Sequence, residues 1–207
     1  MDRINNVKAE VLIEGAIKIV RNAQCLCDEA ELLHNNKMYA RSYALSHLAR
    51  EEFAKSLMLY KVCIDVLSGN KVDWKKVDRR FRDHKQKLVN DRATTDMLFG
   101  SLEVDGKKLD KGVLYNSGTI NYTNHRKNAS LYVDWEKGRF IAPEENFTER
   151  QSYRNLEIAK YRIATLSEVV VSLVEISNKS KDEIKKIFPM EKIMKMAEEY
   201  SNEIGGA

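Results

Sequence analysis

Charged side chains interrupt an apolar stripe within residues 40–55, ARSYALSHLAREEFAK. Helical spacing places a carboxylate and an ammonium group among leucines, in the order Leu45, Leu48, Glu52, Lys55 and Leu59. A charged group is costly to bury unless it is paired or hydrogen-bonded. The pattern therefore predicts that Glu52 and Lys55 face polar partners on a neighbouring element.

A second apolar stripe contains an imidazole, in the order Trp74, Val77, Phe81, His84 and Leu88. Because an unperturbed imidazole has a pKa of about 6.5, a histidine can accept or donate a proton near neutral pH. Two helices that each contribute polar groups to one apolar seam are typical of a site built between the helices of a bundle.

Long amphipathic helices must position these residues, because the chain has few helix breakers. Of its 207 residues only 2 are proline and 9 are glycine, whereas 32% are charged and 43% are hydrophobic. Apolar periodicity predicts helices over residues 8–34, 38–67 and 74–99, and a fourth that begins at a capping box at 148–151. A second capping box at 180–183 predicts a short helix that ends at Pro189, followed by a last helix to about Glu203.

Residues 100–147 differ from the rest of the chain, because glycine, asparagine, aspartate and tyrosine accumulate there and the helical period disappears. The segments VDGKKL, VLYNSGTINY and LYVDWEKGRFIAP combine β-formers with turn dipeptides, which predicts short hairpins. A mobile flap is the alternative, and in either case residues 103–146 are expected to tolerate shortening.

The predicted fold class is therefore all-α, an antiparallel helical bundle that forms a single domain over residues 1–207. A small β-hairpin or loop insertion at about 100–147 separates its third and fourth long helices, and a C-terminal helical cap covers about 181–204. A homodimer is expected, because residues 156–177 carry more regular apolar positions than one small bundle needs to bury.

Composition excludes few classes of protein. The formal net charge of +4 is compatible with a polyanionic partner but does not identify one. Three cysteines, Cys25, Cys27 and Cys63, match no zinc spacing and are predicted to be reduced thiols of the core. No apolar run is long enough to span a membrane, which predicts a soluble, cytoplasmic protein without membrane contact.

Three segments in order along the chain resemble the AbiV-type abortive infection proteins: AREEFAK at 49–55, HKQK at 84–87 and SLYVDWEKGRFIAP at 130–143. These are bacterial anti-phage proteins of the HEPN superfamily of helical domains, and the resemblance covers roughly residues 20–175. It implies a HEPN-like bundle that dimerises through its long helices. In the nuclease branch of the superfamily it also implies a metal-independent ribonuclease, with an arginine followed four to six residues later by a histidine.

Two pairs in the chain match this arginine–histidine signature, Arg79 with His84 and Arg41 with His47. The first is preferred, because His84 lies on an apolar stripe. His47 is offset from the leucines of its own helix and is expected at the surface.

Metal-free RNA cleavage needs a base for the 2′-hydroxyl proton, an acid for the leaving oxygen and cations for the charge on the phosphate. His84 would transfer the proton, and Glu52 would either orient it or pair with Lys55. A homodimer would supply a second histidine. The candidate catalytic residues are His84, Arg79, Glu52 and Lys55, and the candidate RNA-binding cations are Arg80 and Lys87.

The sequence thus predicts a phage-defence protein that acts as a metal-independent endoribonuclease or as an RNA-binding homodimer, with no cofactor. The main alternative is a non-enzymatic adaptor that binds a phage or host protein through the insertion. A di-iron bundle needs the Glu-x-x-His motif on two helices, and the chain has it once, at Glu31 and His34. A purely structural role for the polar residues also stays open.

Overall fold

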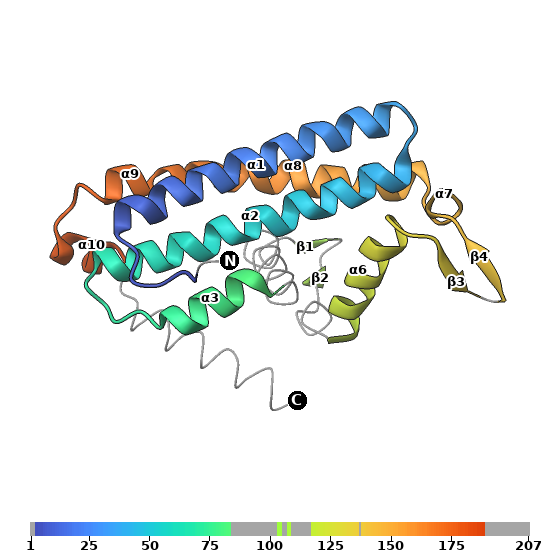
Figure 1. The fold of residues 1–207 in the computed structure, drawn as a ribbon. Helices are drawn as coiled ribbons and strands as arrows, with labels where there is room; N and C mark the ends of the chain where they lie inside the picture. Colours follow the sequence, from blue (N-terminus) through green and yellow to red (C-terminus); the bar gives the residue numbers. More distant parts are fainter. Residues whose placement is uncertain (1–2, 84–102, 105–106, 109–116, 137, 189–207) are drawn as a thin grey trace.

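Three long helices form the body of the molecule: α1 (Ala9–Asn35), α2 (Tyr39–Leu67) and α8 (Glu149–Val171). The computed structural model describes residues 3–83, 103–104, 107–108, 117–136 and 138–188. The three helices lie side by side along most of their length, with α2 in contact with both others (Figure 1). The all-α fold class and the predicted extents of the first two helices are confirmed.

Small and apolar side chains fill the space between these helices. Alanines and a cysteine on α1 allow α2 and α8 to approach closely, and larger residues of α2 and α8 pack against them. The fully enclosed core residues include Ala16, Ala23, Cys27, Phe53, Ile64, Leu156, Val170 and Leu173. The apolar stripe of α8 is therefore buried inside a single chain, so the expectation that it closes a dimer is not supported by the packing.

Local sequence signals explain where several helices begin and end. Thr148 accepts a hydrogen bond from the backbone N–H of Gln151, and Ser180 does the same for Glu183, so both predicted capping boxes are present. α2 ends at Leu67, and Gly69, just after the C-cap Ser68, has a φ of 74°, a left-handed conformation that glycine adopts without strain.

The third helix is shorter than its apolar stripe predicts. α3 (Trp74–Arg82) begins at its predicted cap, where Asp73 accepts a hydrogen bond from Lys76 N at 3.0 Å. It ends at Arg82, because Asp83 has an extended backbone with ψ 114°. Trp74, Val77 and Phe81 pack against the core as predicted. The predicted continuation to residue 99, including His84 and Leu88, lies outside the described residues.

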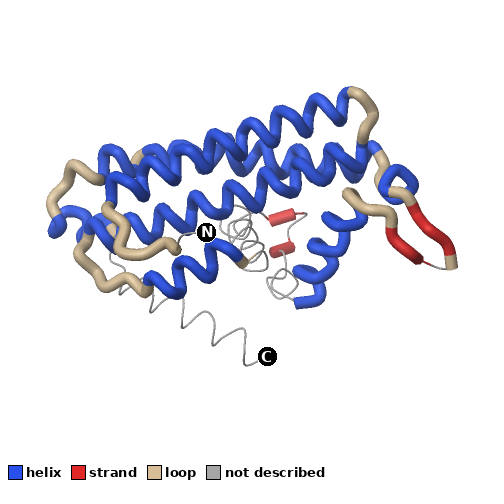
Figure 2. Tube along the Cα trace, in the orientation of Figure 1, coloured by secondary structure: helices blue, strands red, loops and turns tan. Residues whose placement is uncertain are grey.

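The insertion contains a helix as well as the two predicted hairpins (Figure 2). The hairpins are antiparallel pairs of short strands, β1 (Glu103–Val104) with β2 (Lys107–Lys108) and β3 (Asp134–Glu136) with β4 (Arg139–Ile141). The prediction of strands in VLYNSGTINY is wrong from Ser117 onward, since α6 (Ser117–Ala129) is helical. α6 has little amphipathic character, so its sequence offered no helical period to detect.

Short helices complete the described part of the chain. α7 (Pro143–Asn146) leads from the second hairpin into α8, and α9 (Leu173–Ile176) and α10 (Lys181–Ile187) follow α8 at the opposite end of the bundle (Figure 1). Most of the predicted C-terminal cap, from residue 189, lies outside the described residues. Among the helices of the described segments, none is both long and apolar enough to cross a membrane.

All three cysteines are free, and Cys27 and Cys63 are buried as predicted. Cys25 is exposed, so its assignment to the core is wrong. Two positions on an α-helix are separated by about 200°, so Cys25 faces solvent when Cys27 faces the core.

Candidate functional site between α2 and α3

Glu52 and Lys55 form an ion pair one turn apart on α2, and each side chain is 18% exposed. The Lys55 ammonium lies 5.4 Å from the centroid of the Phe81 ring, over its face. The pair therefore lies beside the C-terminal half of α3. This juxtaposition of Glu52 and Lys55 on α2 with the end of α3 is called the α2–α3 seam below.

The last turn of α3 is strongly basic and carries Arg79, Arg80 and Arg82. Cations are favourable at a helix C-terminus, because the backbone carbonyls there carry partial negative charge. Arg82 donates hydrogen bonds to Asp78 at 3.0 and 3.1 Å. A hydrogen bond from the backbone of Ile4 is the main cause that lowers the pKa of Asp78, and Arg82 adds to it. Arg79 is exposed and Arg80 is half-buried.

Four of the six predicted site residues therefore lie on these two helices, Glu52 and Lys55 on α2 and Arg79 and Arg80 on α3. Arg79 is about 200° around α3 from Phe81, the residue that faces Lys55, so the structure does not bring Arg79 against the Glu52–Lys55 pair. His84 and Lys87 lie outside the described residues. In the sequence His84 follows Asp83, the residue at which the described part of α3 ends.

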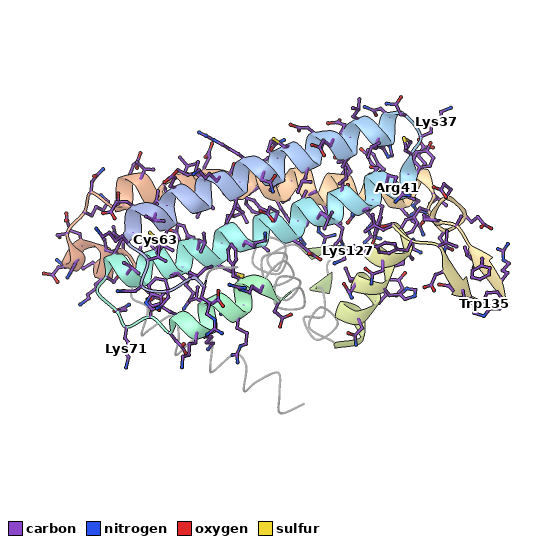
Figure 3. The ribbon with its side chains drawn as sticks, in the orientation of Figure 1. Lys37, Arg41, Cys63, Lys71, Lys127 and Trp135 are labelled. Carbon is purple, nitrogen blue, oxygen red and sulfur yellow. The ribbon has the colours of Figure 1, made fainter. Side chains whose placement is uncertain are left out.

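A second group of polar side chains is enclosed between α2 and α6: His47, Glu51 and Lys127, which we call the buried polar cluster. Glu51 Oε1 accepts a hydrogen bond from Lys127 Nζ at 2.9 Å and lies 3.2 Å from His47 Nε2. Lys127 reaches this position from α6, toward α2 (Figure 3). The expectation that His47 lies at the surface is wrong, because its exposed fraction is 0%.

Burial lowers the pKa of His47, and its hydrogen bond to Glu51 acts in the opposite direction. The imidazole is therefore neutral at pH 7. Its contact with the carboxylate assigns the proton to Nε2, which leaves Nδ1 as an acceptor. Among the described residues no group forms a hydrogen bond with Nδ1.

The polar contacts continue from α2 to α8. Arg50 donates to Asn155 Oδ1 at 2.6 Å, and Asn155 Nδ2 donates to the carbonyl oxygen of Tyr43 at 2.9 Å. Burial lowers the pKa of Arg50 to about 10. Burial, with the neighbouring charge of Arg50, lowers the pKa of Arg162 on α8 to about 8. The interface between α2 and α8 therefore combines an alanine-rich core with buried guanidinium groups.

The second arginine–histidine match is not assembled. Arg41 is exposed, donates a hydrogen bond to the carbonyl oxygen of Leu131 at 3.0 Å, and lines a pocket at the turn between α1 and α2. His47 is enclosed on a different side of the same helix. Six positions on an α-helix correspond to a rotation of about 240°, so the two side chains diverge.

Sequence reasoning missed Glu51, Arg50, Lys127, Asn155 and Arg162. The spacing of His47 and Glu51, four residues apart, was a usable signal for their contact. No local sequence signal indicated the contact of Lys127, because its partner Glu51 is 76 positions away in sequence.

The di-iron alternative finds no support at its single motif. Glu31 pairs with Lys160 on α8, and His34 Nδ1 lies 2.9 Å from the Ser152 hydroxyl oxygen. Both side chains thus have protein partners across the interface between α1 and α8.

Comparison with protein families gives one match, the HEPN_AbiV model, described as AbiV, over residues 11–164. Comparison with curated proteins and with solved structures gives no match. The matched residues run from α1 into α8 and include both the α2–α3 seam and the buried polar cluster. Because they make up well over half of the chain, the chain belongs to the AbiV family of abortive infection HEPN proteins.

Proposed function

We propose that this protein acts in phage defence as a homodimeric endoribonuclease that cleaves RNA without a metal ion, with the α2–α3 seam as its site. The observation that carries the proposal is the partly exposed Glu52–Lys55 pair beside the basic last turn of α3. Membership in a HEPN family supports it, because the nuclease branch of that superfamily uses cations and a histidine.

The cations of the seam suit a phosphodiester. Lys55 offers a point charge on α2, and Arg79, on the exposed side of α3, offers a planar guanidinium that can hold two oxygens of a neighbouring phosphate. The ion pair with Glu52 restrains the Lys55 side chain, which remains partly exposed to solvent. Arg80 and Lys87 would extend the contact along the RNA backbone.

The cleavage reaction needs these cationic side chains and a histidine to transfer protons. His84 takes the proton of the 2′-hydroxyl, and the resulting oxygen attacks the adjacent phosphorus. The 5′-oxygen leaves and takes a proton from the second acid, which is the His84 of the other protomer. The products are a 2′,3′-cyclic phosphate and a 5′-hydroxyl, and the cations stabilise the charge on the phosphate in between.

Accessibility favours the seam over the buried polar cluster. A phosphodiester must touch the group that takes its proton, and His47 has no exposed surface. Glu52 and Lys55 keep part of their surface exposed. The buried polar cluster accordingly has a structural role, in which it fixes α6 against α2.

The homodimer is part of this proposal and rests on exposed apolar residues rather than on the buried stripe of α8. Val171 and Val174 are exposed at the end of α8 and on α9, and their spacing of three positions places them on neighbouring sides of the helical chain. Exposed apolar residues that gather on one region of a surface favour a protein interface.

The test is the chemistry of the products. The purified protein, incubated with total RNA in EDTA, is expected to give discrete fragments with 2′,3′-cyclic phosphate and 5′-hydroxyl ends. Intact RNA, or fragments with 3′-hydroxyl ends, would contradict the proposal.

The second candidate function is a protein-binding adaptor, and the β3–β4 hairpin favours it. Trp135 and Phe140 are 59% and 71% exposed, and their rings pack edge to face at 4.8 Å. Trp135 lies at the outer end of the molecule, away from the long helices (Figure 3). Aromatic residues are enriched at protein interfaces. Phage protection that needs Trp135 while RNA stays intact would identify the adaptor function.

A further inference from the structure

Three metal-ligand side chains meet where the β3–β4 hairpin faces α6. His125 comes from α6, and Asp134 and Glu136 come from β3. One ligand atom of each lies within 4.8 Å of the other two. The closest measured pair is His125 Nε2 with Glu136 Oε1, at 3.7 Å.

The alternation of the strand explains why two carboxylates point to one place. Residues two apart on a strand share a face, so Asp134 and Glu136 lie on one side of the hairpin and Trp135 on the other. Trp135 packs on Phe140, its cross-strand partner, which fixes the orientation of the opposite side. The carboxylate side of the hairpin is the one that meets His125.

The cross-strand partner of Glu136 does not neutralise it. Glu136 lies opposite Arg139 in the register of β3 and β4, where a pair of opposite charges is favourable. The Arg139 guanidinium instead contacts Glu145 at 3.1 Å, between β4 and α7. Glu136 is therefore left to face the imidazole and the second carboxylate.

We propose that His125, Asp134 and Glu136 bind one divalent transition-metal ion of the zinc type, which fixes the hairpin to α6. One imidazole nitrogen and two carboxylate oxygens form a donor set that Zn²⁺ accepts, with water at the remaining position. Zinc–ligand bonds of about 2.0–2.2 Å place ligand atoms about 3.3 Å apart, so the distances between these ligand atoms must shorten by at most about 1.5 Å. Exposed side chains on a short hairpin can make that adjustment.

A bound metal ion would also stabilise the β3–β4 hairpin. Strands of three residues form few backbone hydrogen bonds, and an isolated hairpin is at most marginally stable in water. A metal bound by residues of two elements stabilises the arrangement that it bridges. The proposal does not depend on RNA cleavage, which is assigned to other residues.

Zinc titration of the full-length protein, freed of any affinity tag, tests the site. The chain has two tryptophans, and the Trp74→Phe variant leaves Trp135, between the two carboxylates, as the only tryptophan, which can be excited selectively over the tyrosines. Added Zn²⁺ is expected to change its fluorescence with a stoichiometry of one ion per chain. In the Trp74→Phe parent, the His125→Asn and Glu136→Gln substitutions should each raise the Kd for Zn²⁺ at least tenfold.

Two matched variants serve as controls, His34→Asn on α1 and Glu144→Gln on α7, and both should keep the Kd of the parent. All four variants replace residues outside the hydrophobic core, so circular dichroism is expected to remain unchanged. The proposal is overturned if the parent protein does not bind Zn²⁺, or if His125→Asn and Glu136→Gln bind it as tightly as the controls do.

Discussion

At the scale of single residues, the buried polar cluster makes Lys127 important for stability. The Lys127→Met variant removes the ammonium partner of the enclosed Glu51 carboxylate, which costs roughly 3 to 5 kcal/mol of the free energy of unfolding. Thermal unfolding followed by circular dichroism should show a decrease in Tm on the order of 10 °C. Lys75→Met, at an exposed position on α3, should leave Tm almost unchanged.

A second substitution separates loss of the charge from loss of packing. In the double variant Lys127→Met with Glu51→Gln the carboxylate that lost its ammonium partner is replaced by a neutral amide, so at least half of the lost stability should return. A double variant as unstable as the sum of both single variants would show that the two side chains do not interact.

His47 predicts a dependence of stability on pH. Because burial lowers its pKa below the ordinary value of 6.5, the unfolded chain binds more protons than the folded chain at mildly acidic pH. The stability is fully present above pH 6.5 and is lost as the pH falls toward the lowered pKa. The urea midpoint should therefore decrease between pH 7.5 and pH 5.5, and it should decrease less in His47→Gln. Equal decreases in both proteins would refute this assignment.

The sequence predicted the seam because Glu52 and Lys55 interrupt leucines on a single helix, which is a local signal. It could not distinguish the neighbouring carboxylates, Glu51 and Glu52, since both belong to one AREEFAK segment and only one faces α6. That distinction depends on where α6 packs, which no local pattern encodes.

At the scale of elements, helices with strong periodicity and caps were predictable, and α6 was not. The three long helices carry regular apolar residues, and capping boxes mark α8 and α10. α6 is helical because tertiary contacts select it: Lys127, Ala129 and the adjacent Ser130 are buried against α2. Tertiary packing thus overrides a weak local preference in this segment.

The contacts of α6 change the expectation that all of residues 103–146 can be shortened. Removal of the hairpin alone, with residues 133–140 replaced by a short glycine–serine loop, should lower Tm by only a few degrees, because most of its side chains are exposed. Removal of α6 should abolish a cooperative thermal transition, since it exposes Glu51 and His47. Equal effects of the two deletions would contradict this division.

At the scale of the whole molecule, the proposed site needs two copies of the chain, because one histidine per chain cannot serve as both base and acid. Light scattering coupled to size exclusion should report a dimer at micromolar concentration. Val174→Asp, which places a charge beside the exposed Val171, should shift the mass toward the monomer without loss of helical content. A monomeric wild-type protein would remove the composite site.

The most direct test of the α2–α3 seam is the rate of RNA cleavage in EDTA by the wild type and the His84→Gln variant. General acid–base catalysis contributes on the order of 10²-fold or more, so the variant should lose at least that factor. Its Tm should stay within a few degrees of the wild type, and His34→Gln should cleave at the wild-type rate. Cleavage by His84→Gln at the wild-type rate would contradict the assignment of the site.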